Sequence, residues 1–87
     1  MSPERAEALK PLYDRLQRYA GWLGRERTSV TVRADVEALA VAINTCGDPL
    51  PLLHALETNI ARLPSAEMRK MLRVTASEIR RALAELR

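Results

Sequence analysis

The sequence lacks several features that define common classes of protein. It has no phenylalanine, one cysteine, one histidine and three glycines among 87 residues. The longest uninterrupted apolar run covers residues 38–43, far short of the roughly 20 residues that a membrane-spanning helix needs. No basic stretch leads into an apolar segment near residue 1. We therefore expect neither a signal peptide nor membrane association, and we predict a cytoplasmic location.

What remains is the composition of an ordinary folded domain. Hydrophobic residues make up 47% of the chain and charged residues 29%, which is close to the average for globular proteins. These values exclude disordered, collagen-like and low-complexity classes. Because a second domain would be too small to hold a core, we predict one domain covering residues 1–87. With so few aromatic residues, its core must consist mainly of leucine and other aliphatic side chains.

Apolar residues recur at three- and four-residue spacing in four segments, which is the pattern of amphipathic helices. The segments cover about residues 3–23, 32–46, 49–62 and 66–86. Their apolar stripes are, in chain order, Leu9, Leu12, Leu16, Tyr19, Ala20 and Leu23; Val32, Val36, Leu39, Ala40, Ile43 and Cys46; Leu53, Leu56, Ile60 and Leu63; and Met68, Met71, Leu72, Thr75, Ile79, Leu83 and Leu86. Because short links indicate antiparallel neighbours, we predict an all-α fold, a compact four-helix bundle or bundle-like array.

Proline, glycine and capping residues predict where the first helix begins and ends. Ser2 is a candidate N-cap, and Gly24 is a candidate C-terminal stop. Pro11 lies inside the segment, where its missing backbone donor should kink the helix or restart it near Lys10.

Proline, glycine and capping residues mark the boundaries of the third and fourth predicted helices more clearly. The motif at residues 47–49, Gly-Asp-Pro, supplies a C-terminal glycine, an N-cap aspartate and a proline for the first turn of the third helix. Pro64 ends that helix, and Ser65 is the expected N-cap of the fourth.

The second segment has two unusual features. Residues 28–32 are mostly β-branched, and we interpret them as a lead-in to a helix capped by Ser29 or Thr31. Between residues 36 and 43 only Glu37 is polar. Helices that are apolar around most of their circumference are usually buried, so we expect this one to be central.

Residues of the kinds that perform catalysis or bind metals are scattered. His54 is the single histidine, with Glu57 three residues later, whereas a metal or catalytic site needs several such groups. Cys46 lies at the carboxyl end of an apolar stripe, where the helix dipole disfavours a thiolate, so we expect a packed core thiol. None of the glycines belongs to a nucleotide-binding fingerprint. We predict no metal, no cofactor and no enzymatic activity.

Trp22 marks the first candidate surface. By helical geometry its side chain points away from the apolar stripe, on the side that carries Arg15 and Arg18, and Arg25 follows in the loop. A tryptophan among arginines is suited to anchor a protein interface or to stack on bases. The alternative is that Trp22 folds back onto residues 28–32 and is partly covered.

The fourth segment carries the second candidate surface. Arg69, Arg73 and Arg80 fall within about 40° of one another around the helix, with Lys70 and Arg81 beside them. Such a basic ridge could follow a phosphate backbone, although a solvated helix face with internal Glu–Arg pairs has the same pattern. The net charge of the chain is only +3, lower than dedicated nucleic-acid binders usually carry.

The leading hypothesis is a small protein–protein interaction module, an adaptor, subunit or inhibitor whose partner has an acidic surface. The alternative is a nucleic-acid-binding accessory protein that uses the basic ridge of the last helix. About three heptads of apolar stripe in residues 66–86 would also allow pairing with a second copy of the chain.

Overall fold

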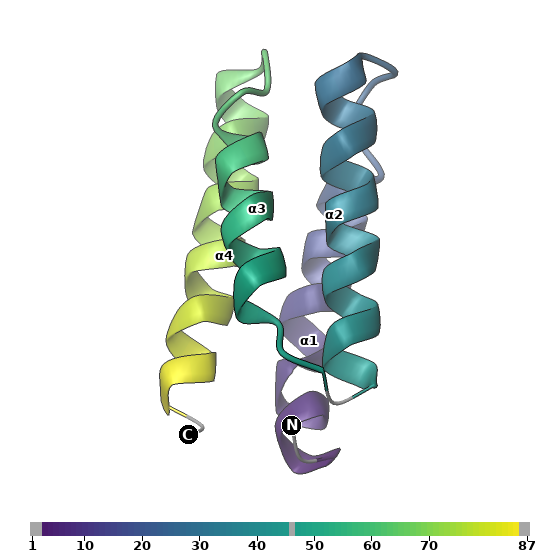
Figure 1. Cartoon of the computed structure of the whole chain (residues 1–87). Helices are drawn as coiled ribbons and strands as arrows, with labels where there is room; N and C mark the ends of the chain where they lie inside the picture. Colours follow the sequence, from purple (N-terminus) through teal and green to yellow (C-terminus); the bar gives the residue numbers. More distant parts are fainter. Residues whose placement is uncertain (1–2, 46, 86–87) are drawn as a thin grey trace.

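The chain folds into an antiparallel bundle of helices joined by short links (Figure 1). The helices of the computed structural model are α1 (Pro3–Ala20), α2 (Arg27–Asn44), α3 (Leu50–Ile60) and α4 (Ala66–Glu85). The structure describes residues 3–45 and 47–85. The predicted all-α four-helix bundle is confirmed.

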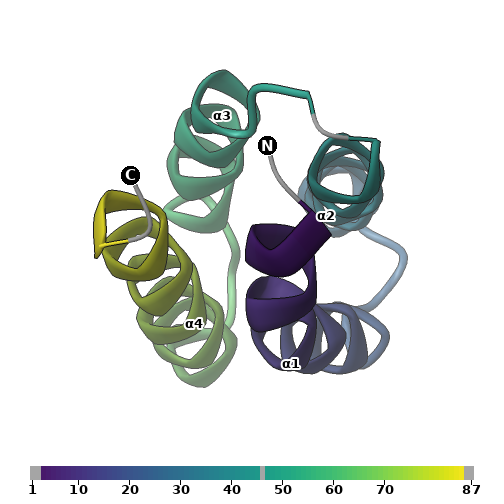
Figure 2. The same ribbon diagram turned by 90° about the horizontal axis from the view of Figure 1, so that it is seen from below.

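The helices stand at the corners of a square when the bundle is viewed along its length (Figure 2). Each helix packs against the two that neighbour it around the square, so that α1 contacts α2 and α4, and α3 contacts the same two helices. The chain runs up, down, up and down. The α1–α2 and α3–α4 links therefore lie at the end of the bundle away from the N- and C-terminal ends (Figure 1). The bundle measures 35 × 20 × 19 Å.

The predicted apolar stripes form the core. Their buried members are Leu9, Leu16 and Ala20 of α1; Val32, Val36, Leu39, Ala40 and Ile43 of α2; Leu53, Leu56 and Ile60 of α3 with Leu63 after it; and Leu72, Thr75, Ile79 and Leu83 of α4. The structure buries four further described residues that the stripes did not include, Tyr13, Ser29, Pro49 and Ala76. The Tyr13 ring fits the core because its hydroxyl reaches Asn44 Oδ1 on α2 at 3.0 Å.

Helix α1 differs from the sequence prediction at two points. It continues through Pro11 without a break, so the predicted restart near Lys10 is wrong. Pro11 has no N–H to pair with the Glu7 carbonyl. Both residues are exposed, so this carbonyl lies on the solvent side of α1, where water can reach it. The helix ends at Ala20 rather than near Gly24, because the chain turns there to reach α2.

Helix α2 begins at Arg27, five residues before the predicted start at residue 32. The β-branched residues 28–32 form its first turns, because burial of Val32 outweighs the small helix propensity cost of such residues. Glu26 occupies the N-cap position, so the predicted caps Ser29 and Thr31 are wrong. Instead the Ser29 hydroxyl, which is buried, donates a hydrogen bond of 2.9 Å to the Glu26 carboxylate.

The prediction that α2 is central is also wrong. Val41 is 57% exposed, Val30 is half exposed, and Ala34 and Ala38 lie in the open between them. In a bundle of four helices each helix occupies a corner and shows one side to solvent (Figure 2). The outer side of α2 carries Val30, Ala34, Ala38 and Val41 together with the polar Thr31 and Glu37, and no neighbouring helix covers it.

The remaining boundaries agree well with the sequence. Ser65 Oγ accepts the Met68 N–H at 3.2 Å, as expected of an N-cap. At the start of α3, Pro49 rather than Asp48 holds the N-cap position, and Asp48 Oδ1 accepts the Leu50 N–H at 3.2 Å. The roles predicted for Ser2, Cys46 and Leu86 lie outside the described residues.

Candidate functional site

Each seam between neighbouring helices carries a hydrogen-bonded pair of side chains. The pairs are Tyr13 with Asn44 between α1 and α2, Asn59 with Asp35 between α2 and α3, Arg80 with Glu57 between α3 and α4, and Arg15 with Glu78 between α4 and α1. These pairs link each helix to its neighbours at the edge of the apolar core. They also decide which charged residues face outward and are left to meet a partner.

Trp22 lies on the surface at the link between α1 and α2. Its side chain is 61% exposed, so the alternative in which residues 28–32 cover it is wrong. The indole ring packs against the Tyr19 ring, with 5.3 Å between ring centroids and 43° between ring planes. This contact supports one side of the indole and leaves the rest open to solvent, the arrangement expected of an interface anchor.

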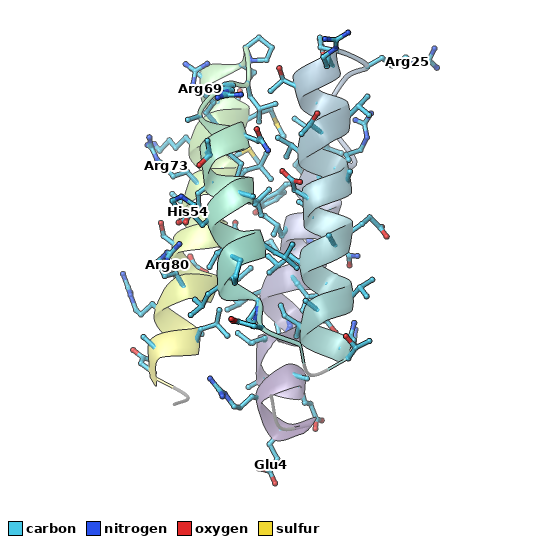
Figure 3. The ribbon with its side chains drawn as sticks, in the orientation of Figure 1. Glu4, Arg25, His54, Arg69, Arg73 and Arg80 are labelled. Atoms are coloured by element: carbon cyan, nitrogen blue, oxygen red, sulfur yellow. The ribbon has the colours of Figure 1, made fainter. Side chains whose placement is uncertain are left out.

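Two of the predicted neighbours of Trp22 share its exposure. Arg18 and Arg25 are both exposed and form no ion pair with any described residue. Arg25 projects from the link end of the bundle, as the side-chain view shows (Figure 3). Arg15 differs, because its guanidinium forms an ion pair with Glu78 on α4. Arg18 and Arg25 are therefore near Trp22 in the chain and unpaired with described acidic residues, whereas Arg15 lies at the α1–α4 seam.

A small hollow adjoins Trp22 at this end of the bundle. It encloses about 140 Å³, and its apolar walls include Trp22, Leu63, Pro64 and Met68. The Glu26–Ser29 hydrogen bond closes one side, where the pKa of Glu26 is lowered by its own backbone N–H and then by the Ser29 hydroxyl. We call the hollow together with Trp22, Arg18 and Arg25 the link-end corner.

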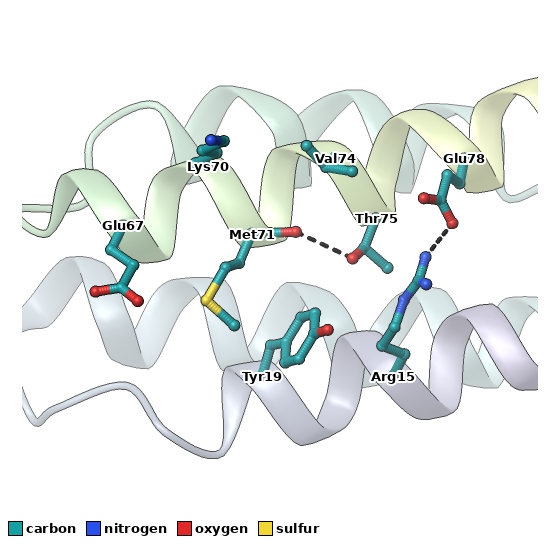
Figure 4. Close-up of a pocket in the computed structure, with 8 residues that line it drawn as sticks. All are labelled: Arg15, Tyr19, Glu67, Lys70, Met71, Val74, Thr75 and Glu78. Atoms are coloured by element: carbon teal, nitrogen blue, oxygen red, sulfur yellow. Dashed lines mark hydrogen bonds and ion pairs between the residues drawn. The ribbon is translucent and has the colours of Figure 1, made fainter.

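A second, larger groove runs between α1 and α4 (Figure 4). Its volume is about 380 Å³. Its residues are Arg15, Tyr19, Glu67, Lys70, Met71, Val74, Thr75 and Glu78. Tyr19, Met71 and Val74 give the groove an apolar middle, and the Thr75 hydroxyl is satisfied within α4 by the Met71 carbonyl at 3.0 Å. Charged side chains stand at both ends (Figure 4).

The predicted basic ridge is divided by the tertiary structure. Arg69 donates hydrogen bonds to the Leu63 and Pro64 carbonyls, and it thereby satisfies acceptors in the link after α3. Arg80 forms an ion pair with Glu57 of α3, and hydrogen bonding to this carboxylate raises the pKa of Arg80. Two of the five ridge residues are therefore engaged in holding α4 to the rest of the bundle.

The other three basic residues remain outward. Lys70, Arg73 and Arg81 are exposed and form no ion pair with any residue that the structure describes. Arg69, Arg73 and Arg80 follow one side of α4 (Figure 3). A phosphate backbone that approached this side would meet one unengaged guanidinium, Arg73, between two that already bind protein oxygens.

His54 is exposed on α3, and Glu57, three residues on, is bonded to Arg80. Among residues 3–45 and 47–85, no group of three or more histidine, cysteine or acidic side chains is placed to hold a metal ion. Cys46 lies outside those residues.

Sequence reasoning missed the α1–α4 groove. Tyr19 and Met71 were assigned to core stripes, yet both are only partly buried and line the groove. Glu67 and Glu78 had no predicted role. The sequence feature that could have indicated this groove is Val74, an aliphatic residue outside the apolar stripe of its own helix.

Comparisons of the chain with protein-family models, with curated proteins and with solved structures found no match. No helix in the described part of the chain has both the length and the apolar character needed to cross a membrane. Any conclusion about function therefore depends on the geometry of the surface.

Proposed function

We propose that this chain is a small, cytoplasmic, non-enzymatic protein–protein interaction module, an adaptor, subunit or inhibitor, that binds its partner through the link-end corner. The exposed Trp22 carries the proposal. Tryptophan and arginine are the residues most enriched among those that dominate interface energetics, and Trp22 has Arg18 one turn before it. The adjoining hollow offers apolar walls for a side chain of the partner.

The partner surface is expected to be acidic with an apolar centre. Arg18 precedes Trp22 and Arg25 follows it in the chain, and neither forms an ion pair with a described acidic side chain. Charges at the rim of an interface accelerate encounter and favour the correct partner more than they increase affinity. The affinity would come from burial of the indole and of the apolar side chain that fills the hollow.

The nucleic-acid alternative has weaker support. Arg69 and Arg80 are bonded within the bundle, which leaves Lys70, Arg73 and Arg81 for phosphates. We therefore treat nucleic-acid binding as an outcome of the test.

The test combines partner capture with the fluorescence of Trp22. We expect solvent-exposed, red-shifted emission that oligonucleotides do not change. A partner that the wild-type chain captures is then purified. It should no longer bind the double variant that carries Trp22→Ala and Arg18→Ala. Val30→Ala combined with Arg73→Ala is the matched control, because it removes an exposed apolar residue and an exposed arginine elsewhere.

Two results would overturn the proposal. Undiminished binding by the Trp22 and Arg18 double variant would show that the partner uses another surface. Quenching of Trp22 by single- or double-stranded oligonucleotides that disappears with added salt would favour the nucleic-acid alternative instead.

A further inference from the structure

Two arginines hold the two links at the far end of the bundle in the same way. Arg33 of α2 donates from Nη1 to two successive carbonyls of the α1–α2 link, at 3.0 and 2.7 Å. Arg69 of α4 donates from Nη1 to two successive carbonyls of the α3–α4 link. The four carbonyls belong to Leu23 and Gly24 in the first link and to Leu63 and Pro64 in the second. Each link is thereby tied to the helix that follows it.

The hollow beside Trp22 lies between these two links. All four residues whose carbonyls the arginines bind line it, together with Trp22 and Met68. Leu63 is 2% exposed and belongs to the hydrophobic core, so one wall of the hollow is continuous with the core. Because the arginines satisfy the carbonyls on both sides, the lining offers mainly apolar groups to a ligand.

The same two arginines bring positive charge to the edge of the hollow. Their guanidiniums bind neutral carbonyls, and neither forms an ion pair with a described carboxylate. Arg25 and Arg62, which are both exposed, add positive charge to the two links. Among the described residues one acidic side chain, Glu26, lines the hollow, and its carboxylate accepts the Ser29 hydroxyl. Positive charge therefore exceeds negative charge around the hollow.

We propose that the hollow binds one aliphatic side chain of the size of leucine, which the partner presents beside a carboxylate, and that Arg33 and Arg69 are positioning residues that hold its walls in place. The inference rests on the proposed function, because it names what the link-end corner receives. An apolar cavity of about 150 Å³ accepts a molecule of benzene. A hollow of about 140 Å³ accordingly has room for the four carbons of a leucine side chain.

The bonds from Arg33 and Arg69 lower the cost of binding. A link whose carbonyls face only water samples many conformations, and a ligand would have to order it. With these carbonyls already bonded, the walls of the hollow are in position before the partner arrives. Each arginine uses only Nη1 for the carbonyls of the described chain. A guanidinium has five N–H donors, so the others can bond the carboxylate of the partner.

Titration of the full chain with the blocked peptide acetyl-Asp-Leu-Asp-amide tests the proposal. NMR of methionine methyl groups labelled with carbon-13 locates the binding, because Met68 lines the hollow and Met71 lines the separate α1–α4 groove. The signals of the Met68 methyl and the Trp22 indole N–H should shift to saturation, and the Met71 methyl signal should change little. For so small a ligand we expect a dissociation constant in the millimolar range.

Two matched peptides separate the side chain from the charge. Acetyl-Asp-Ala-Asp-amide should bind at least about tenfold more weakly, because it lacks the carbons that the hollow would bury. Acetyl-Asn-Leu-Asn-amide keeps the side chain and the shape without the charge, and it should bind about threefold more weakly at low salt. Added salt should remove the second difference and leave the first.

Arg33→Met and Arg69→Met test the positioning role. Each should weaken binding of the neutral peptide acetyl-Asn-Leu-Asn-amide by about fivefold, because the loosened link must be ordered. The neutral peptide is used because its binding does not depend on the charge that the substitution removes. Arg33→Lys and Arg69→Lys, which keep a donor for the carbonyls, should regain part of the affinity. Arg73→Met is the matched control, since Arg73 is exposed and forms no ion pair with a described residue.

Four results would overturn the inference. They are the absence of a saturable shift at Met68 and Trp22, equal affinity for the leucine and alanine peptides, equal affinity at low salt for the charged and neutral leucine peptides, and unchanged affinity in both methionine variants. Circular dichroism of each variant verifies that the helices persist.

The peptide titration and the partner test can fail separately. If the peptide binds as expected but the purified partner still binds the double variant of Trp22 and Arg18, the proposed function fails and the hollow still binds a leucine side chain. If that variant loses the partner and the hollow binds no peptide, the proposed function stands and this inference fails.

Discussion

Arg15 of α1 and Glu78 of α4 form an ion pair that joins the first and last helices of the bundle. Their side chains are 34% and 39% exposed, so water screens the interaction. We expect a coupling free energy of about 0.5 kcal/mol from a double-mutant cycle of Arg15→Met and Glu78→Gln. Urea unfolding of the four proteins, in dilute solution so that association does not contribute, measures it. Strictly additive effects would show that the pair contributes nothing to stability.

Two valines of α2 provide a matched test of its orientation. Val36 is 2% exposed and Val41 is 57% exposed, although both lie in the run that the sequence predicts to be buried. Val36→Ala should lower the free energy of unfolding by about 2 kcal/mol, because it removes buried methyl groups and leaves a cavity. Val41→Ala should change it by less than about 0.5 kcal/mol. Equal losses in thermal or urea unfolding would mean that α2 is covered on both sides.

Pro11 tests whether α1 is one helix. In the interior of a continuous helix, proline is less favourable than alanine by about 3 kcal/mol, part of which the folded chain recovers by relaxation. Pro11→Ala should therefore increase the free energy of unfolding by roughly 1 to 3 kcal/mol. A helix that restarted near Lys10 would place proline in a favourable first-turn position. In that case the substitution would be neutral or destabilising.

Glu26 should contribute to the pH dependence of folding. The pKa of its carboxyl is lowered by its own backbone N–H and by the Ser29 hydroxyl. A carboxyl whose pKa is lower in the folded state stabilises the fold above its unfolded pKa, and this contribution is lost as pH falls through the folded pKa.

Replacement of Glu26 should consequently reduce the loss of stability on the acid side. We expect Glu26→Gln to lower stability at neutral pH and to flatten the decline between neutral pH and the lowered pKa. Ser29→Ala should raise the pKa of Glu26 toward its ordinary value, which an NMR titration of the side chain would detect. Glu37→Gln, at an exposed position in the middle of α2, controls for the loss of one negative charge. An unchanged Glu26 pKa in Ser29→Ala would exclude the hydroxyl as a cause.

The helical class and most of the core follow from local patterns in the chain. Residues such as Leu39, Leu53 and Leu56 recur at the helical period, and all three are fully buried. Ser65 correctly predicted the start of α4, because an N-cap side chain bonds to backbone N–H groups in the first turn of its own helix. The apolar period and the N-cap can be predicted from sequence because each depends on residues that are close together in the chain.

Side-chain chemistry at the seams was decided by the tertiary structure. Arg15, grouped with Arg18 and Trp22 by helical spacing, turns to Glu78, which is 63 residues away in sequence. Arg80 likewise forms an ion pair with Glu57 on another helix and is not part of an open basic ridge. Helical periodicity gives the direction of a side chain from its own axis, but not which helix stands in that direction.

Exposure of apolar residues was decided in the same way. The sequence placed α2 at the centre because Val41 and its neighbours are apolar, yet in a square of four helices no position is surrounded. Trp22 lies in the link that follows α1, beyond its last residue Ala20, and no other helix covers its side chain, which is 61% exposed. The sequence thus determined which faces of each helix are apolar. Only the packing of the four helices decided which of those faces became core and which remained open to a partner, because burial depends on what lies opposite in space.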